Sequence, residues 1–436
     1  MHMMARSGAC LMLDPMGVAE QPPDHRSIKK TAKTSTGRDV SFWLVKYEAS
    51  TGIWLLGASC PETQDPYGGG AIPSFLEVVC VDKGLALLRL RTPDRGVPTE
   101  YFVYNIADDI LLDHRLPQIH PEVCSSSSVG LLCKILDDGS YRYVVANLRL
   151  DLDAKTEQME AHLDWWGPDC TEWIQHKVDP DFTKQTNSDY TEEMKHEYMC
   201  EWKTDEAVSM ENCMLWVDLW KGILRSSDLL SCDKNKTPEL EYVPLPGDLR
   251  PKWPVKDAHH RRERPGTFRS VACCQGKLKL VNLRSADGNS LEVEIWILST
   301  MNWSWSKKDT YKYPQLWDSV QESVQHKFPS ESLPRWNFKP ACFPVLSTQN
   351  GNILYLTLSA ENKAFLVRII LKDRKVRMAE YSPFGKHRNL LRSVDISKGS
   401  TNCTDPTAEW DKVGIWTIHG GDNILTRLAK KLLPTR

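Results

Sequence analysis

Short strand-like runs that recur along most of the chain restrict its fold more than any other feature. Such runs occupy residues 39–47, 75–82, 85–91, 101–106, 141–150, 277–284 and 291–299. Each run is rich in Val, Leu, Tyr or Trp and is bounded by Gly, Pro, Asp or Asn, a composition typical of β-strands. About 24 runs occur, close to the spacing of roughly 8 to 12 residues that is typical of all-β domains. Helical periodicity is limited to short pieces at 319–328 and 423–433.

The C-terminal half repeats one pattern of strands. Residues 213–246 form a predicted strand, a tight turn at Gly222, a second strand, a loop and a third strand that ends in prolines. Residues 268–314 and 342–383 follow a similar order, with Gly276 and the Asn-Gly pair at 350–351 in their turns. Four antiparallel strands in each repeat are the blade pattern of a β-propeller. We therefore predict an all-β, β-propeller-like fold of about six four-stranded blades. Two β-sandwich domains are the structural alternative.

Charge and hydropathy exclude several classes of protein. The formal net charge is -2, with 55 Lys+Arg against 57 Asp+Glu, so there is no overall attraction to nucleic acid or to an anionic membrane. The longest apolar runs, such as 364–371, are far shorter than the roughly 18 residues that a membrane span needs. The N-terminal residues lack a signal-peptide core. We expect a soluble protein of the cytoplasm and/or the nucleus that does not associate with membranes.

The cysteines favour a reducing compartment and no metal site. There are 13, an odd number, and no Cys-x-x-Cys pair occurs that would preorganise half of a zinc tetrahedron. We expect free thiols, no metal and no cofactor. The motifs of zinc proteases, serine hydrolases and dinucleotide-binding proteins are also absent, so no residue is assigned as catalytic.

The stretch "CMLWVDLWKGIL" at 213–224 looks most like a site, because Asp218 lies between two tryptophans. Strand alternation predicts that Leu215 and Val217 point to one face and that Trp216, Asp218 and Trp220 point to the other. An Asp before a tight turn can accept backbone N–H bonds, whereas general acid–base catalysis calls for a second titratable group, and none is adjacent. We interpret Asp218 as a structural residue that fastens the turn.

A proline-rich basic loop at 247–267 is the candidate partner-binding segment. Its prolines disfavour strand pairing, and its basic residues exceed its acidic ones, so it can steer an acidic partner. We expect Trp253 to be the apolar anchor, with Arg261, Arg262 and Arg264 around it. The adjacent His259 and His260 are not expected to bind a metal, because their side chains point in opposite directions and the arginines repel a cation.

The central residues resemble the plant family known as domain of unknown function 1618 (DUF1618), which is greatly expanded in grasses. The hallmark is "WVDLWKGIL" at 216–224 followed by "LEYVPLP" at 240–246, and shorter pieces match elsewhere in the family's order. The motif residues, interpreted as structural, are Trp216, Asp218, Leu219, Gly222, Ile223, Leu224, Tyr242, Pro244, Leu245 and Pro246. The resemblance implies no catalytic residue, cofactor or substrate. Its strand order is similar to that of F-box-associated and kelch-type propellers, although this chain lacks an N-terminal F-box.

The resemblance and the strand pattern together suggest a division of the chain. Residues 1–35 form an N-terminal segment with the first strand, residues 36–385 a single propeller-like domain with the family core at 213–385, and residues 386–436 a divergent C-terminal tail. The function we expect is non-enzymatic protein–protein interaction. An enzyme with a central propeller pocket and unknown reaction is the alternative, and a nucleic-acid-binding protein is the less favoured third class. The sequence names neither the protein partner nor an oligomeric state.

Overall fold

The computed structural model describes the backbone of 20 segments: residues 10–13, 16–17, 30–33, 39–47, 53–59, 75–91, 99–105, 110–117, 126–152, 159–182, 199–200, 202–231, 233–249, 265–284, 290–313, 344–348, 351–360, 363–373, 375–381 and 392–395. These residues are almost entirely strands. Their only helical pieces are four three-residue 3-10 turns and the pair 199–200. No helix in these segments is long and apolar enough to cross a membrane. The all-β prediction is therefore confirmed.

The chain divides into two compact units. Unit 1 comprises Met1–Pro121, Thr357–Val367 and Arg377–Arg436, and unit 2 comprises Glu122–Leu356 and Arg368–Val376. The predicted domain boundaries at 35 and 385 stay a prediction.

Unit 1 contains two five-stranded sheets. The first has the order β27-β1-β5-β4-β3, with β1 Cys10–Leu13, β3 Lys30–Lys33, β4 Asp39–Tyr47, β5 Ile53–Ser59 and β27 Arg392–Asp395. The second has the order β2-β6-β7-β8-β9, with β2 Met16–Gly17, β6 Phe75–Asp82, β7 Leu85–Arg91, β8 Glu100–Asn105 and β9 Ile110–Arg115. Strand β27 pairs antiparallel with β1, so segments from the two ends of the chain share one sheet.

Unit 2 contains three complete sheets. The first has the order β10-β11-β12-β13, with β10 Val129–Ile135, β11 Tyr141–Leu152, β12 Met159–Trp166 and β13 Ile174–Val178. The second has the order β14-β18-β17-β16-β15, with β14 Pro180–Asp181, β15 Glu206–Met210, β16 Cys213–Asp218, β17 Gly222–Ser227 and β18 Leu240–Pro244. The third has the order β19-β20-β21-β22, with β19 Arg269–Cys274, β20 Lys277–Arg284, β21 Leu291–Ser299 and β22 Ser304–Tyr313.

Short turns and one further sheet complete the described elements. The 3-10 turns are η1 Ser126–Ser128, η2 Leu229–Ser231, η3 Gly247–Leu249 and η4 Pro265–Thr267. The further sheet has the order β23-β24-β25-β26, with β23 Val345–Leu346, β24 Ile353–Ala360, β25 Lys363–Ile370 and β26 Lys375–Tyr381.

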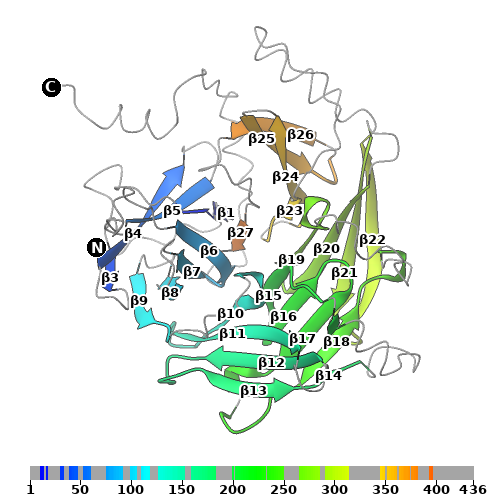
Figure 1. The fold of residues 1–436 in the computed structure, drawn as a ribbon. Helices are drawn as coiled ribbons and strands as arrows, with labels where there is room; N and C mark the ends of the chain where they lie inside the picture. Colours follow the sequence, from blue (N-terminus) through cyan, green and yellow to red (C-terminus); the bar gives the residue numbers. More distant parts are fainter. Residues whose placement is uncertain are drawn as a thin grey trace, which may run out of the picture. The chain divides into compact units, whose positions relative to one another are not determined.

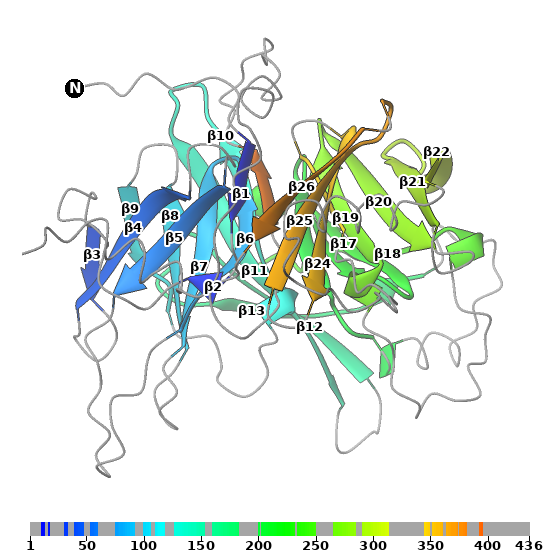
Figure 2. The same cartoon turned by 90° about the horizontal axis from the view of Figure 1, so that it is seen from above.

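The sheets of unit 2 succeed one another through edge strands. Strand β10 contacts β15, β15 contacts β19, and β19 contacts β23, so one edge strand of each sheet lies against an edge strand of the next (Figures 1 and 2). This succession is typical of propeller blades and differs from the two layers of a sandwich. The propeller-like prediction is confirmed. The blades differ slightly from those predicted, because three of the six described sheets have five strands rather than four.

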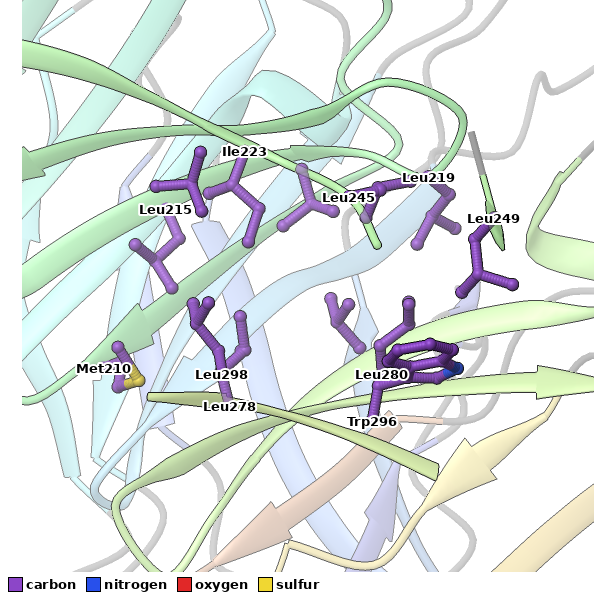
Figure 3. Packing of buried hydrophobic residues seen from close by; sticks show 13 residues of the cluster. Met210, Leu215, Leu219, Ile223, Leu245, Leu249, Leu278, Leu280, Trp296 and Leu298 are labelled. Atoms are coloured by element: carbon purple, nitrogen blue, oxygen red, sulfur yellow. The ribbon is translucent and has the colours of Figure 1, made fainter. Parts of the chain in front are cut away.

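A continuous apolar layer joins the second and third sheets of unit 2. Figure 3 shows Leu215, Leu219, Ile223, Leu245 and Leu249 on one side of this layer, and on the other side Met210 with the β20 and β21 residues Leu278, Leu280, Trp296 and Leu298. The alternation expected for β16 is found here, because Leu215, Val217 and Leu219 all belong to this cluster. Burial of such a layer is the main favourable term that holds neighbouring blades together.

Several strand boundaries could be predicted from the sequence. The runs at 39–47, 75–82, 85–91, 277–284 and 291–299 are strands with those bounds, and β8 and β11 differ from their predicted ranges by one or two residues. The predicted helical pieces at 319–328 and 423–433 lie outside the described residues.

Candidate functional site

The Asp218 carboxylate accepts backbone hydrogen bonds around the turn that joins β16 to β17. Its Oδ1 accepts from the backbone N–H groups of Trp220 at 2.8 Å and Lys221 at 3.1 Å. Its Oδ2 accepts from the backbone N–H of Lys203 at 3.0 Å. Asp218 is fully buried. Its carboxylate therefore pairs with backbone N–H groups at a site where water does not supply an acceptor. This arrangement holds a turn and a neighbouring segment in place.

A second carboxylate supports the same turn from the other side. The backbone N–H of Leu219 donates to Asp205 Oδ2 at 2.9 Å, and the backbone N–H of Asp205 donates to the Val217 carbonyl at 2.8 Å. The Lys221 carbonyl accepts from the Tyr242 hydroxyl at 3.0 Å. The turn is therefore tied to the segment before β15 and to β18 as well as to its own strands.

Trp216 joins the second sheet of unit 2 to the first. Its side chain has no exposed surface, and its indole Nε1 donates to the Ser128 carbonyl in η1 at 2.7 Å. Met214, on the same face of β16, occupies the space left by Gly130 of β10, where an added Cβ would lie 2.6 Å from the Met214 sulfur. This face of β16 therefore packs against the preceding sheet.

Trp220 does not share the face of Trp216, contrary to the strand alternation expected from the sequence. Strand β16 ends at Asp218, so alternation no longer applies two residues later. The half-buried Trp220 ring meets Phe268 edge to face, with centroids 5.6 Å apart. The Arg269 guanidinium lies 4.8 Å from the Trp220 ring centroid. Trp220 thus contacts the third sheet of unit 2, on the opposite side from Trp216.

The remaining motif residues lie in the core around this turn. Leu219, Ile223 and Leu245 belong to the apolar layer of Figure 3, and Leu224 is fully buried. The Tyr242 ring stacks on the Phe182 ring, with the ring centroids 4.5 Å apart. The Pro244 carbonyl accepts a hydrogen bond from Trp305 Nε1 at 3.0 Å, and the Pro246 carbonyl accepts one from the backbone N–H of Leu249 at 2.8 Å. The assignment of the whole motif as structural stays a prediction.

The surroundings of Gly222 leave no room for a Cβ. A Cβ at this position would lie 2.5 Å from the Val243 carbonyl oxygen and 2.7 Å from the Tyr242 ring. We expect Gly222→Ala to lower the free energy of unfolding by about 1–3 kcal/mol through overpacking. Gly167→Ala is the control, because its Cβ would meet nothing closer than 3.5 Å. Urea denaturation of both variants checks this, and equal stability of the two would contradict it.

The predicted partner-binding residues Trp253, Arg261, Arg262 and Arg264 lie outside the described residues. The segments on either side of them are described. Leu249 is buried in the apolar layer, and Pro265 is buried at the start of η4. Phe268, three residues after Pro265, is the ring that meets Trp220. The described residues that flank 250–264 therefore lie beside the Asp218 turn.

A repeated polar brace was missed by the sequence reading. In the first sheet of unit 2, buried Asn147 accepts from the Ser128 hydroxyl at 2.8 Å and donates to Asp164 at 3.4 Å, and Arg149 Nε donates to Asp164 at 2.6 Å. In the third sheet, buried Asn282 accepts from Arg269 Nε at 3.0 Å and donates to Glu294 at 2.7 Å. The shared tripeptide Asn-Leu-Arg at 147–149 and 282–284, each followed by an acidic residue on the next strand, was the available signal.

The two braces occupy the same register positions in their sheets. Asn147 pairs directly with Asp164, and Asn282 pairs directly with Glu294. Burial alone would raise the pKa of Glu294, but hydrogen bonds from Lys307 and Asn282 and the charge of Arg284 outweigh it, so this pKa is lowered. Burial lowers the pKa of Arg269 to about 10, and the nearby charge of Arg284 acts in the same direction.

Within the described part of the chain, no three His, Cys, Asp or Glu residues gather in a way that could hold a metal ion.

Comparison with known proteins gives a family match for part of the chain. Residues 216–355 match the family described as "Protein of unknown function (DUF1618)", which supports the resemblance of the central motif. No curated protein matches the chain.

Several solved structures show a partial likeness to this chain. AofleA from Arthrobotrys oligospora is 8% identical over 86% of this chain and 87% of its own, with a TM-score of 0.28. An uncharacterized protein from Listeria monocytogenes is 8% identical over 70% and 82%, with a TM-score of 0.22. A hypothetical selenium-binding protein from Sulfolobus tokodaii is 9% identical over 64% and 74%, with a TM-score of 0.26. Similarity this low transfers no property to this chain.

Proposed function

We propose that this chain is a non-enzymatic protein-binding module of the grass-expanded DUF1618 family, acting in the cytoplasm or nucleus. The loop at 247–267 contributes to the partner-binding surface, with Trp253 as its apolar anchor. The observation that carries the proposal is that the Asp218 carboxylate is engaged in backbone hydrogen bonds. Asp218, the one acid in the run 216–224, accepts three backbone hydrogen bonds and fastens the turn beside which the described residues that flank 250–264 lie. Rigid elements that support an irregular loop are the usual arrangement of a binding protein.

The composition of the loop supports recognition of a protein partner. Trp253 supplies a large apolar side chain of the kind that dominates interface energetics, and Arg261, Arg262 and Arg264 add positive charge to the same segment. The chain as a whole carries a net charge of -2, so this local positive charge favours an acidic protein surface over a long nucleic acid.

Affinity purification from the native tissue tests the proposal. We expect the intact chain to capture reproducible protein partners that are lost when Arg261, Arg262 and Arg264 are all replaced by glutamate. The control replaces three cations that the structure shows to be exposed, Lys134, Arg142 and Lys277, by glutamate and should keep the partners. Retention of every partner by the loop variant, with unchanged salt sensitivity, would show that the loop is only solvated. Absence of any reproducible partner would also reject the proposal.

A further inference from the structure

At one end of the third sheet of unit 2, the cationic side chains outnumber the carboxylates. Glu294, whose side chain is 2% exposed, accepts from Lys307 Nζ at 2.6 Å and from Asn282, and it faces Arg284 Nε at 3.3 Å. Arg269 is buried beside them and donates to the neutral oxygens of Asn282 and Leu219. Three cations therefore surround one carboxylate among the described residues.

The strand register identifies the other charged residues that share a face of the sheet with Glu294. Lys312 lies opposite Glu292, and Glu292 lies opposite Arg284, so both belong to the same face as Glu294. This face then carries the cations Arg269, Arg284, Lys307 and Lys312 and the carboxylates Glu292 and Glu294. The local surplus is two positive charges. We call this set of six residues the cationic end.

The matched brace in the first sheet shows that the fold does not require this surplus. Asp164 is also 2% exposed, yet Asn147 and Arg149 alone supply its charge-assisted partners among the described residues. Arg149 and Lys177 share their face with Asp151, Glu160 and Asp164, which leaves one surplus negative charge. The same brace is therefore built with opposite net charge, and the extra cations of the third sheet call for another explanation.

Two of the cations reach solvent, and an aromatic pair lies beside them. The side chains of Arg284 and Lys307 are 46% and 36% exposed, so each can offer donors outward while it contacts Glu294. Arg269 lies 4.8 Å and 5.3 Å from the ring centroids of Trp220 and Phe268. Phe268 follows η4 directly, so the cationic end adjoins the point where loop 250–264 rejoins the sheet.

We infer that the cationic end binds an Asp- or Glu-rich segment of a protein partner. This inference rests on the proposed function and adds the chemistry of the partner to it. The carboxylates of that segment pair with Arg284, Lys307 and Lys312, and an adjacent side chain packs on Trp220. A local surplus of two charges suits a short run of carboxylates, whereas a long polyanion would also meet the acidic remainder of the protein.

Peptide binding to the full chain tests the inference. The probes are a fluorescein-labelled peptide with a run of six glutamates, its glutamine analogue and a single-stranded DNA of equal charge, followed by fluorescence anisotropy at low and moderate salt. We expect the glutamate peptide alone to bind, with an affinity that falls as salt rises. Replacing both Arg284 and Lys307 by glutamine should weaken binding about tenfold, as expected when two partly exposed ion pairs are lost.

Matched variants keep the result interpretable. Lys277→Gln removes the same charge from the opposite end of strand β20 and should leave the affinity unchanged. Lys312→Gln changes an exposed side chain and should weaken binding even if the double variant fails to fold. Equal binding of the glutamate and glutamine peptides, or of the DNA through the same residues, would overturn the inference. So would an affinity that is unaffected by the loss of Arg284, Lys307 or Lys312.

The failure of this inference can be distinguished from failure of the proposed function. If the loop variant loses its native partners while peptide binding ignores Arg284 and Lys307, the protein-binding module stands and the acidic segment is rejected. If purification yields no partner although the peptide binds through these residues, the proposed function fails and the acidic-segment site remains.

Discussion

Trp216→Ala is expected to lower the free energy of unfolding by about 3–5 kcal/mol. The side chain is fully buried, is among the largest in the core, and donates its indole N–H to the Ser128 carbonyl. Truncation to alanine therefore removes the apolar contact, leaves a cavity and breaks a hydrogen bond that joins two sheets. Stability measured by urea denaturation, with the midpoint and slope reported together, checks the prediction.

Two further variants separate the causes of this loss. Trp216→Phe retains most of the ring but not the N–H, so it should cost less than Trp216→Ala and should report the hydrogen bond together with the remaining change in packing. Met301→Ala is the control, because Met301 is 96% exposed and its truncation should change stability by no more than about 0.5 kcal/mol. An unchanged unfolding midpoint for Trp216→Ala would show that the tryptophan is not packed between sheets.

The strands were predictable because their signal is local. Alternation of apolar residues and bounding turn residues identified β4, β6, β7, β20 and β21 with the bounds that the structure has. The positions of Leu215 and Val217 followed from the same period of two. These features depend on neighbouring residues alone, so one sequence is enough to read them.

The contacts between sheets were not predictable in this way. Trp220 was placed on the wrong side because the strand ends at Asp218, and nothing in the alternation marks that end. The Asn147 brace joins η1, β11 and β12, the Asn282 brace joins β19, β20 and β21, and the bonded partners are separated by 12 to 19 residues. Strand β27 pairs with β1 across almost the whole chain. A periodic pattern holds no information on such distant pairings, although the repeated Asn-Leu-Arg tripeptide was available.

The contacts of the Asp218 turn could be predicted from the sequence only in part. An aspartate before a tight turn suggested hydrogen bonds to the turn itself, and the bonds from Trp220 and Lys221 are of that kind. The third bond, from Lys203, comes from a segment 15 residues earlier and could not be inferred from the local sequence. That third bond converts a local turn residue into one that also positions the chain before β15.

Asp218→Ala is expected to lower the free energy of unfolding by about 3–4 kcal/mol, and Asp218→Asn by about 1–3 kcal/mol. Alanine removes all three hydrogen bonds from a site that has no exposed surface. Asparagine keeps one oxygen for Trp220 and Lys221 but places an amide N–H₂ group against the N–H of Lys203. Denaturation of both variants by urea measures the difference.

Asp138→Ala is the matched control for this turn. Asp138 also accepts a backbone bond two residues ahead, from Ser140 at 2.8 Å, but it is exposed. Water can replace the lost acceptor there, so the cost should stay below about 1 kcal/mol. If Asp218→Asn instead kept full stability and lost protein partners, Asp218 would belong to the binding surface rather than to the support of the turn. If stability falls and the remaining folded protein still captures its partners, the carboxylate acts through the turn, and the contact with the partner is made elsewhere.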